Sequence, residues 1–371
     1  MSHLTFTSSE GPSLGVEIEL ALVDANSMAL RSGCQEILAK LPDSLRNEVK
    51  PELMQCYIEA NSKICQTAAE AEDDLRGKLG AVETIANDLG MRLYWSGTHP
   101  FSSWRDQLVT PNERYRSLIN LLQDTARQLV TFGLHVHVGV DSGDKAVMLC
   151  DRMLRHLPAL LALSCNSPFW EGRNTGVSSW RSRVMDGLPT AGLPPLMRNW
   201  SEYVWLVNHL VETRYIDSIR ELWWDLRPHH NFGTIEIRIC DVTGNLKDAI
   251  GIAALCQCLV RHLSIQIDQG AYQHDCHPFM IRENKWQAAR YGLDAQLVDS
   301  NMYRLQSARD VIRELVTELR PLGEELDCAA YLDHVLEMAD RPNGSQPQAE
   351  LFDELNDPAE VVRRMTEHSG L

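Results

Sequence analysis

The sequence predicts an α+β fold built on an antiparallel sheet. Some segments alternate apolar and polar residues with a period of two, which is typical of strands with one buried face. Other segments repeat apolar residues at steps of three and four, which is typical of helices. The two kinds of segment follow one another without the regular strand and helix alternation that builds a parallel sheet, so the sheet is expected to be antiparallel.

The N-terminal part is expected to contain strands in "GVEIELALVD" (15–24) and within "VKPELMQCYIEANSKICQ" (49–66). A helix is predicted over 67–89, because apolar residues recur there at helical spacing, and Gly90 suits the C-terminus of such a helix. The segment "MRLYWSG" (91–97) is predicted to be a short strand.

The middle of the chain begins with a helix predicted over 112–130, for which Asn112 provides the N-cap. The segment "GLHVHVGV" (133–140) alternates and is predicted to be a strand. Residues 145–165 are predicted to form a buried helix interrupted at Pro158, because proline cannot donate a helical hydrogen bond.

Residues 166–200 are predicted to be irregular, because they are rich in Gly, Pro, Asn and Ser. So long an irregular segment within a compact domain is usually functional, and we expect a lid or binding loop. A helix over 201–222 and the alternating strand "GTIEIRICDV" (233–242) are predicted to follow.

The C-terminal part is expected to form helices over 245–268 and 300–338. Residues 342–348 are predicted to be a linker before a short C-terminal helix, because they contain Pro, Gly, Asn and Ser. The sequence contains no internal repeat or low-complexity tract, so residues 1–371 are expected to form a single domain.

The formal net charge is -16, from 35 basic and 51 acidic side chains. This balance argues against nucleic acid or an anionic membrane as the main partner. The N-terminus lacks the pattern of a secretory signal, and no stretch approaches the roughly 20 apolar residues of a membrane span, so a soluble, cytoplasmic protein is expected. The ten scattered cysteines are interpreted as buried thiols.

Four predicted strand segments combine an apolar face with a polar face of unusual composition. The polar faces carry Glu17 and Glu19, Glu59, His135 and His137, and Thr234, Glu236, Arg238 and Cys240. A half-buried sheet would explain the alternation alone. Solvated faces, however, usually carry Thr, Ser, Lys and mixed charges, whereas these repeat like charges two residues apart, where they repel one another.

Adjacent carboxylates are unfavourable unless a cation lies between them. Oxygen-rich clusters with an occasional imidazole suit Mg²⁺ or Mn²⁺ better than zinc, and protein sites for Mg²⁺ usually include substrate phosphates. Nearby arginines suit phosphate oxygens as well. Neither glycine-rich phosphate-binding motif is present, so metals and arginines would have to hold the phosphates of any bound nucleotide.

Seven motifs in order from about residue 13 to 300 carry a family resemblance: "GVEIEL", "GTHPF", "PNERY", "GLHVHVG", "LALSCNSPFW", "DLRP" and "GTIEIRICD". Together they resemble the type 2 glutamate-cysteine ligases, also called the carboxylate-amine ligase family. The resemblance implies a glutamine synthetase-like fold. In that fold, a curved antiparallel sheet has a metal-binding concave face and helices pack on its other face.

The resemblance also implies the reaction and its small-molecule partners. ATP, with Mg²⁺ or Mn²⁺, would phosphorylate the γ-carboxylate of glutamate, and an amine would then attack the γ-glutamyl phosphate. Cysteine is the amine in the named reaction, which gives γ-glutamylcysteine for glutathione biosynthesis. A homodimer is also plausible, although no residue fixes it.

The same resemblance implies roles for individual residues. The metal ligands would be Glu17, Glu19, Glu52, Glu59, His135 and Glu236. His137 and Arg227 would face the nucleotide phosphates, and Arg238 would contact phosphate or the transferring group. Arg181 is expected to contact the γ-phosphate. The neighbours of Arg181 depart from the family pattern, so the acceptor pocket is not defined.

Two other classes of function remain open. A sheet of this kind could serve an ATP-dependent phosphotransferase of the guanidino-kinase type, which accumulates a phosphorylated product. It could also bind a metal or a nucleotide without catalysis. The amine acceptor stays open too, because a methyl or thiol difference changes pocket affinity by only about 1–3 kcal/mol.

Overall fold

The computed structural model describes residues 4–271, 273, 276–299, 304–368 and 370–371. At its centre is a seven-stranded sheet with strand order β10-β11-β5-β1-β3-β2, and β4 pairs with the last residues of β1. Every pairing in this sheet is antiparallel. Its strands are β1 (Leu14–Asp24), β2 (Val49–Pro51), β3 (Tyr57–Asn61), β4 (Met91–Tyr94), β5 (Gly133–Gly139), β10 (Leu226–His229) and β11 (Thr234–Asp241).

The described residues also form helices and short two-stranded ribbons outside the central sheet. The helices are α1 (Cys34–Lys40), α2 (Ala68–Asp88), α3 (Glu113–Leu122), α4 (Asp124–Arg127), α5 (Gly143–Met153), α6 (Leu157–Ser164), α7 (Trp180–Met185), α8 (Trp200–Glu212), α9 (Leu246–Asp268), α10 (Pro278–Tyr291), α11 (Ala308–Glu325), α12 (Ala329–Asp340), α13 (Ser345–Leu355) and α14 (Pro358–His368). The ribbons pair β6 (Phe169–Trp170) with β7 (Arg173–Asn174), β8 (Ala191–Gly192) with β9 (Trp223–Trp224), and β12 (Gln296–Asp299) with β13 (Arg304–Ser307).

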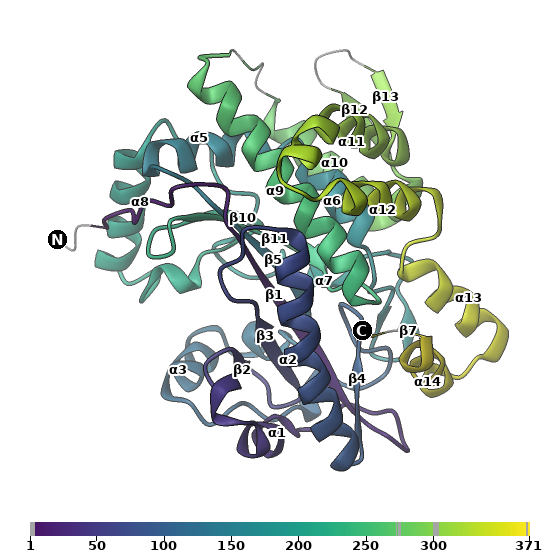
Figure 1. The fold of residues 1–371 in the computed structure, drawn as a ribbon. Helices are drawn as coiled ribbons and strands as arrows, with labels where there is room; N and C mark the ends of the chain where they lie inside the picture. Colours follow the sequence, from purple (N-terminus) through teal and green to yellow (C-terminus); the bar gives the residue numbers. More distant parts are fainter. Residues whose placement is uncertain (1–3, 272, 274–275, 300–303, 369) are drawn as a thin grey trace.

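The helices cover the apolar face of the sheet. Val16, Ile18 and Leu20 of β1 are buried, and α2 and α9 pack against that strand. Figure 1 shows these two helices lying across the strands. α5 and α6 pack against β11. Burial of each large apolar side chain contributes roughly 1.5–3 kcal/mol, so this packing fixes which face of the sheet remains for polar residues.

Side-chain caps fix where several of these helices begin. The Thr67 side chain accepts a hydrogen bond from the backbone N–H of Glu70 at the start of α2. Asn245 does the same for Asp248 at the start of α9. Asn112 caps α3 as the sequence predicts. Each cap satisfies a backbone donor that the helix leaves unpaired.

The predicted α+β fold, with an antiparallel sheet and helices packed on it, is confirmed. Three predicted helices are shorter than expected, because a residue with positive φ interrupts the helical backbone. The helix over 112–130 breaks at Gln123, with φ of 52°. The helix over 201–222 ends at Glu212, shortly before Arg214, and that over 300–338 divides near Asp327. The start of this last prediction is also wrong, because β13 (Arg304–Ser307) precedes α11, which begins at Ala308. Residues 300–303 lie outside the described residues.

The predicted linker over 342–348 is wrong in its second half, because α13 begins at Ser345. The polar residues of this segment anchor it. The Asn343 side-chain oxygen accepts hydrogen bonds from the Ser345 amide and hydroxyl, and the Gln348 amide donates to the buried Asn166 side chain. Two helices follow, rather than one short helix.

Helix α9 differs from the expectation that no segment approaches a membrane span. It has 23 residues, and an 18-residue window within it has a mean hydropathy of 1.5. Most of that window, 67%, is buried inside the protein, as in a core helix. The predicted buried thiols are confirmed for nine of the ten cysteines, all of which are free, whereas Cys276 is partly exposed.

Candidate functional site

The sheet register brings acidic and imidazole side chains from three strands together on the polar face. Glu17 on β1 lies opposite His135 on β5, and His137 on β5 lies opposite Glu236 on β11. One carboxylate oxygen of Glu17, Oε2, lies 3.1 Å from His135 Nδ1, and the other, Oε1, lies 3.3 Å from His137 Nε2. His137 Nε2 is also 3.9 Å from Glu236 Oε1. Glu17 therefore lies between the two imidazoles.

A second part of the site contains mainly carboxylates. Glu19 on β1 lies opposite Glu59 on β3. Burial first, and then repulsion from Glu17, Glu52 and Glu19, raises the pKa of Glu59 well above its ordinary value. Burial and repulsion from Glu19 likewise raise the pKa of Glu52 to about 7. These carboxylates repel one another, and a bound cation would remove that repulsion.

Two groups of three side chains have ligand atoms that all lie within 4.8 Å of one another. One is Glu17, Glu59 and His135; the other is Glu17, His137 and Glu236. Carboxylate oxygens with one imidazole form a donor set that suits Mg²⁺ or Mn²⁺. The residues therefore fit a divalent ion. The sequence predicts His135 as the histidine ligand, and the second group adds His137 as a further candidate.

Glu17 on β1 and Glu236 on β11 are held in the ionised form by their neighbours. Burial alone would raise the pKa of Glu17, but hydrogen bonds and charge from His135 and His137 hold it well below its ordinary value. Burial likewise opposes ionisation of Glu236, and Arg227, Arg238 and His137 outweigh it, which leaves the pKa well below the ordinary value. This end of the site thus contains charged carboxylates compensated by neighbouring cations.

Arg227 and Arg238 both pair with Glu236, but they differ in how far their guanidinium groups are occupied. Arg227 Nε lies 2.7 Å from Glu236 Oε2, and its Nη1 donates to the carbonyl oxygens of Ile219 and Leu222. Arg238 Nη1 also bonds Glu236, whereas the buried Arg238 Nε has no hydrogen-bond partner among the described residues. The guanidinium of Arg227 is therefore largely occupied by contacts within the protein. Arg238 keeps one N–H donor, at Nε, that a ligand could use.

Arg181 reaches the site from α7. It is 3% exposed, its two terminal nitrogens donate to the carbonyl oxygens of Ile239 and Arg238, and its Nε has no hydrogen-bond partner in the described part of the chain. A Cβ on Gly133 would lie only 2.3 Å from Arg181 Nη2. The missing side chain at Gly133 therefore makes room for the guanidinium.

Asp241 is a site residue that the sequence analysis missed. Its carboxylate accepts hydrogen bonds from the Asn166 amide at 2.9 Å, the Ser167 hydroxyl at 2.7 Å and the Ser179 hydroxyl at 2.8 Å. Ser167 also accepts from the Arg181 amide. Asp241 therefore holds both ends of the segment that delivers Arg181.

A β-bulge explains why Asp241 was missed. The register between β11 and β5 shifts between Ile237 and Cys240, so that Cys240 lies opposite Leu134 and Asp241 lies opposite Gly133. The prediction that Cys240 shares a face with Glu236 is therefore wrong, because the extra residue exchanges the two faces. The sequence signal for this change is the "ICD" (239–241) that ends the strand, where an acidic residue follows two apolar ones.

The segment predicted to be irregular over 166–200 has two different parts. Its first part contains β6, β7 and α7 and is anchored by Asp241. Its last part contains the exposed residues Pro195, Leu196 and Arg198. A lid role for this segment stays a prediction. Because Asp241 anchors the first part, a moving lid would have to be the last part, around Leu196.

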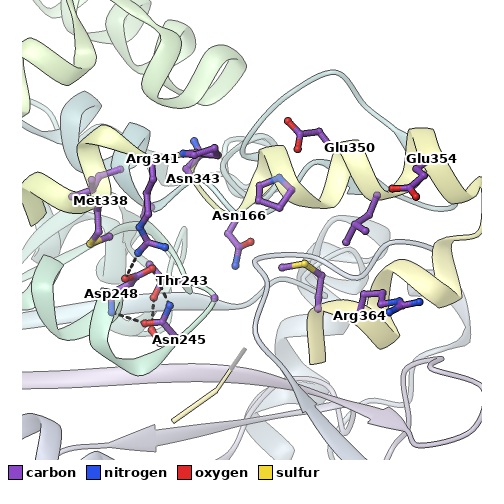
Figure 2. A pocket seen from close by; sticks show the side chains of 18 of the residues that line it. Asn166, Thr243, Asn245, Asp248, Met338, Arg341, Asn343, Glu350, Glu354 and Arg364 are labelled. Atoms are coloured by element: carbon purple, nitrogen blue, oxygen red, sulfur yellow. Dashed lines mark hydrogen bonds and ion pairs between the residues drawn. The ribbon is translucent and has the colours of Figure 1, made fainter. Parts of the chain in front are cut away.

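The larger cavities of the described residues lie away from this site. One of about 750 Å³ opens between α9, α12, α13 and α14, where Arg341 pairs with Asp248 and Glu350 and Glu354 line the rim (Figure 2). None of the predicted site residues lines it. A much smaller cavity lies beneath the site, between Arg181, Trp223, Asp225 and Arg238. The polar face itself carries the charged side chains described above.

Comparisons with known proteins agree with the geometry. A family profile described as glutamate-cysteine ligase family 2 matches residues 13–368. The chain is 40% identical over 361 residues to a Gloeobacter violaceus protein named "Putative glutamate--cysteine ligase 2", and the match covers 97% of each chain. It is 42% identical over 338 residues to a Frankia alni protein of the same kind, covering 90% of this chain and 88% of the relative.

Solved structures share the fold at low sequence identity. A glutamate–cysteine ligase from Francisella tularensis in complex with AMP matches with a TM-score of 0.69 at 12% identity, covering 98% of this chain and 90% of that chain. A bifunctional glutathione synthetase from Pasteurella multocida matches with a TM-score of 0.61 at 14% identity, covering 96% of this chain and 50% of that chain.

Proposed function

This chain belongs to the glutamate-cysteine ligase family 2, and on that premise we propose that it joins the γ-carboxylate of glutamate to an amine at the expense of ATP. Cysteine is the amine that we propose first, because it is the one named in the family description. The observation that carries the proposal is the convergence of Glu17, His137 and Glu236 from three separate strands onto one face.

We propose that the acidic face holds Mg²⁺ or Mn²⁺. The ligands would be Glu17, Glu19, Glu52, Glu59, His135 and Glu236, and the geometry supports His137 as a further candidate beside Glu17 and Glu236. Divalent ions would supply charge neutralisation on the phosphate oxygens and orient them for transfer. The mutual repulsion that raises the pKa of Glu59 supports this role, because it marks a site that favours a cation.

The arginines would act on the transferring phosphoryl group. Arg238 and Arg181 each have a buried Nε without a partner among the described residues, and both guanidinium groups lie next to the bulge in β11. Such donors suit the equatorial oxygens, where charge must be stabilised during transfer. Glutamate's carboxylate is a poor electrophile. Its phosphorylation would provide a good leaving group for attack by the amine.

Water must be kept away from an acyl phosphate. The anchored segment around Arg181 would close one side of the site, and the exposed residues near Leu196 would provide a lid. We retain the cytoplasmic location, the homodimer and the place in glutathione biosynthesis as proposals from the family resemblance. The absence of a membrane or nucleic-acid partner likewise stays a prediction from the net charge.

Phosphate release measured with ATP, Mg²⁺ and glutamate, while the amine is varied, tests this function. The ligase proposal expects release that depends on the amine and a γ-glutamyl amide detectable by mass spectrometry. A phosphotransferase would instead accumulate a phosphorylated product without any amine. ATP binding with no turnover for any amine would favour the non-catalytic alternative and contradict the ligase.

A further inference from the structure

We propose that Phe232 and His229, at the turn between β10 and β11, form a stacking platform for the nucleotide base of the ATP. The inference rests on the proposed function and extends it from the phosphates to the base. The two aromatic rings lie beside His137, and neither is among the groups proposed to act on the phosphates.

The geometry of the two rings is that of a platform. The rings of Phe232 and His229 lie parallel, with an interplanar angle of 13° and centroids 4.1 Å apart. Phe232 is nonetheless 59% exposed. His229 therefore supports one face of the Phe232 ring, and the large exposed fraction of Phe232 leaves ring surface for a planar ligand.

The platform is joined directly to the phosphate end of the site. His137 Nε2 lies 3.3 Å from Glu17 Oε1. The His137 ring also packs edge to face against His229 and Phe232, with ring centroids 5.6 Å and 5.7 Å apart, respectively. Arg227 and Arg238 lie at this same end, where both pair with Glu236. A polyphosphate held here would place its base beyond His137, on the side where Phe232 is exposed.

The turn that carries the platform is held in place. The N-terminal segment runs alongside it, with the Thr7 amide donating to the His230 carbonyl and the Ser9 hydroxyl donating to the Gly233 carbonyl at 3.1 Å. Gly233 has φ of 65°, and a Cβ there would lie 1.7 Å from the Thr7 carbonyl oxygen. A rigid aromatic surface binds a planar base at a smaller cost in ordering than a mobile one.

The platform suits a flat aromatic heterocycle, because its two rings are stacked on one another and offer a ring face to a ligand. Such a face stacks on any nucleobase, and a purine offers the larger contact area. The chemical class of the ligand is therefore a purine nucleoside triphosphate.

Binding of two probes to the full chain in the presence of Mg²⁺ tests the platform: ATP, which has a base, and inorganic tripolyphosphate, which has none. Phe232→Ala is expected to weaken ATP binding about tenfold by calorimetry and to leave tripolyphosphate binding within twofold of the unmodified protein. Phe232→Leu, which keeps apolar area but no ring, should resemble Phe232→Ala, whereas Phe232→Tyr should retain the affinity. Phe279→Ala removes a similarly exposed phenylalanine on α10 and should change neither probe.

The outcomes separate this inference from the proposed function. Unchanged ATP affinity in Phe232→Ala would overturn the platform even if the protein ligates glutamate. Equal weakening of ATP and tripolyphosphate would also overturn it, because the ring would then be supporting the phosphate end. Loss of ATP affinity alone, in a protein that shows no amine-dependent turnover, would support the platform and contradict the ligase. Failure of the unmodified protein to bind ATP would overturn both.

Discussion

His137 lies directly opposite Glu236 in the register of β5 and β11, with 3.9 Å between its Nε2 and the nearer carboxylate oxygen. His137 also lies 3.3 Å from Glu17 on the next strand. Burial opposes protonation of this imidazole, but the charges of Glu236 and Glu17 outweigh that effect and raise the pKa of His137 above its ordinary value. A divalent cation bound by the same carboxylates would compete with that proton, so metal binding and protonation of His137 should oppose one another.

Replacing one acidic residue should separate catalysis from stability. Glu19→Gln removes a charge that raises the pKa values of Glu52 and Glu59. We expect turnover to fall at least 100-fold, because the cation loses a ligand, while the melting temperature of the metal-free protein stays level or rises as repulsion is relieved. Phosphate-release assays and thermal melts in a chelator check this. Turnover close to that of the unmodified protein would contradict the catalytic role of the cluster.

The proton held by Glu52 should stabilise the metal-free protein by an amount that is lost as pH rises from about 4.5 to 7. The pKa of Glu52 is raised from its ordinary value of 4.5 to about 7, so in this window the folded state keeps a proton that the unfolded state has lost. Stability falls wherever the folded state binds more protons. In chelator, the melting temperature of the unmodified protein relative to that of Glu52→Gln should therefore drop across this range, and Mg²⁺ should reduce the drop. Melting temperatures of the two proteins that follow pH in parallel would count against the assignment.

Arg238→Lys should impair transfer severely despite keeping the charge. The Arg238 guanidinium pairs with Glu236 and still has a free Nε donor among the described contacts, and a lysine ammonium cannot reproduce both. We expect at least a 100-fold fall in kcat, measured by phosphate release at saturating ATP. Circular dichroism should show an unchanged fold. If kcat survives and only KM for ATP rises, Arg238 binds the nucleotide without acting on the transferring group.

Gly133→Ala should displace Arg181. The added methyl would meet Arg181 Nη2 at 2.3 Å, and because this atom ends a flexible side chain, the guanidinium would move rather than the strand. We expect at least a tenfold loss of turnover with a small loss of stability. Gly77→Ala on α2 is the matched control, since its Cβ would meet no atom within 4 Å, and it should leave activity unchanged and stabilise the helix by roughly 0.5–1 kcal/mol. Equal activity in the two variants would argue against a role for Arg181.

The sequence could predict the faces of the strands but not every register. Alternation alone places Glu17 and Glu19 on one side of β1, and His135 and His137 on one side of β5. Which carboxylate meets which imidazole depends on pairing between distant strands, and period-two reasoning fails where a bulge inserts a residue, as it does before Cys240. The role of Asp241 was lost for that reason.

Other errors have local causes. The predicted helix over 112–130 contains no proline or glycine, so nothing in its composition signals the positive φ at Gln123. The polar residues of 342–348 were interpreted as a linker, whereas Asn343 and Gln348 form hydrogen bonds inside the protein. Polar composition predicts exposure only when no buried partner is available. The single-domain organisation and the roles of the individual site residues stay predictions.

The distance in sequence between Glu17 and Glu236 has a consequence for how the chain can be cut. A fragment that ends before β5 would contain Glu17, Glu19, Glu52 and Glu59 without His135 and His137, the two imidazoles that offset the charge of Glu17. Such a fragment would concentrate negative charge in a half-built sheet, and we expect it to fold only in high salt or at low pH. Splitting this protein into two co-expressed halves is therefore best attempted after β11, where both imidazoles are present and Glu236 is accompanied by Arg227 and Arg238.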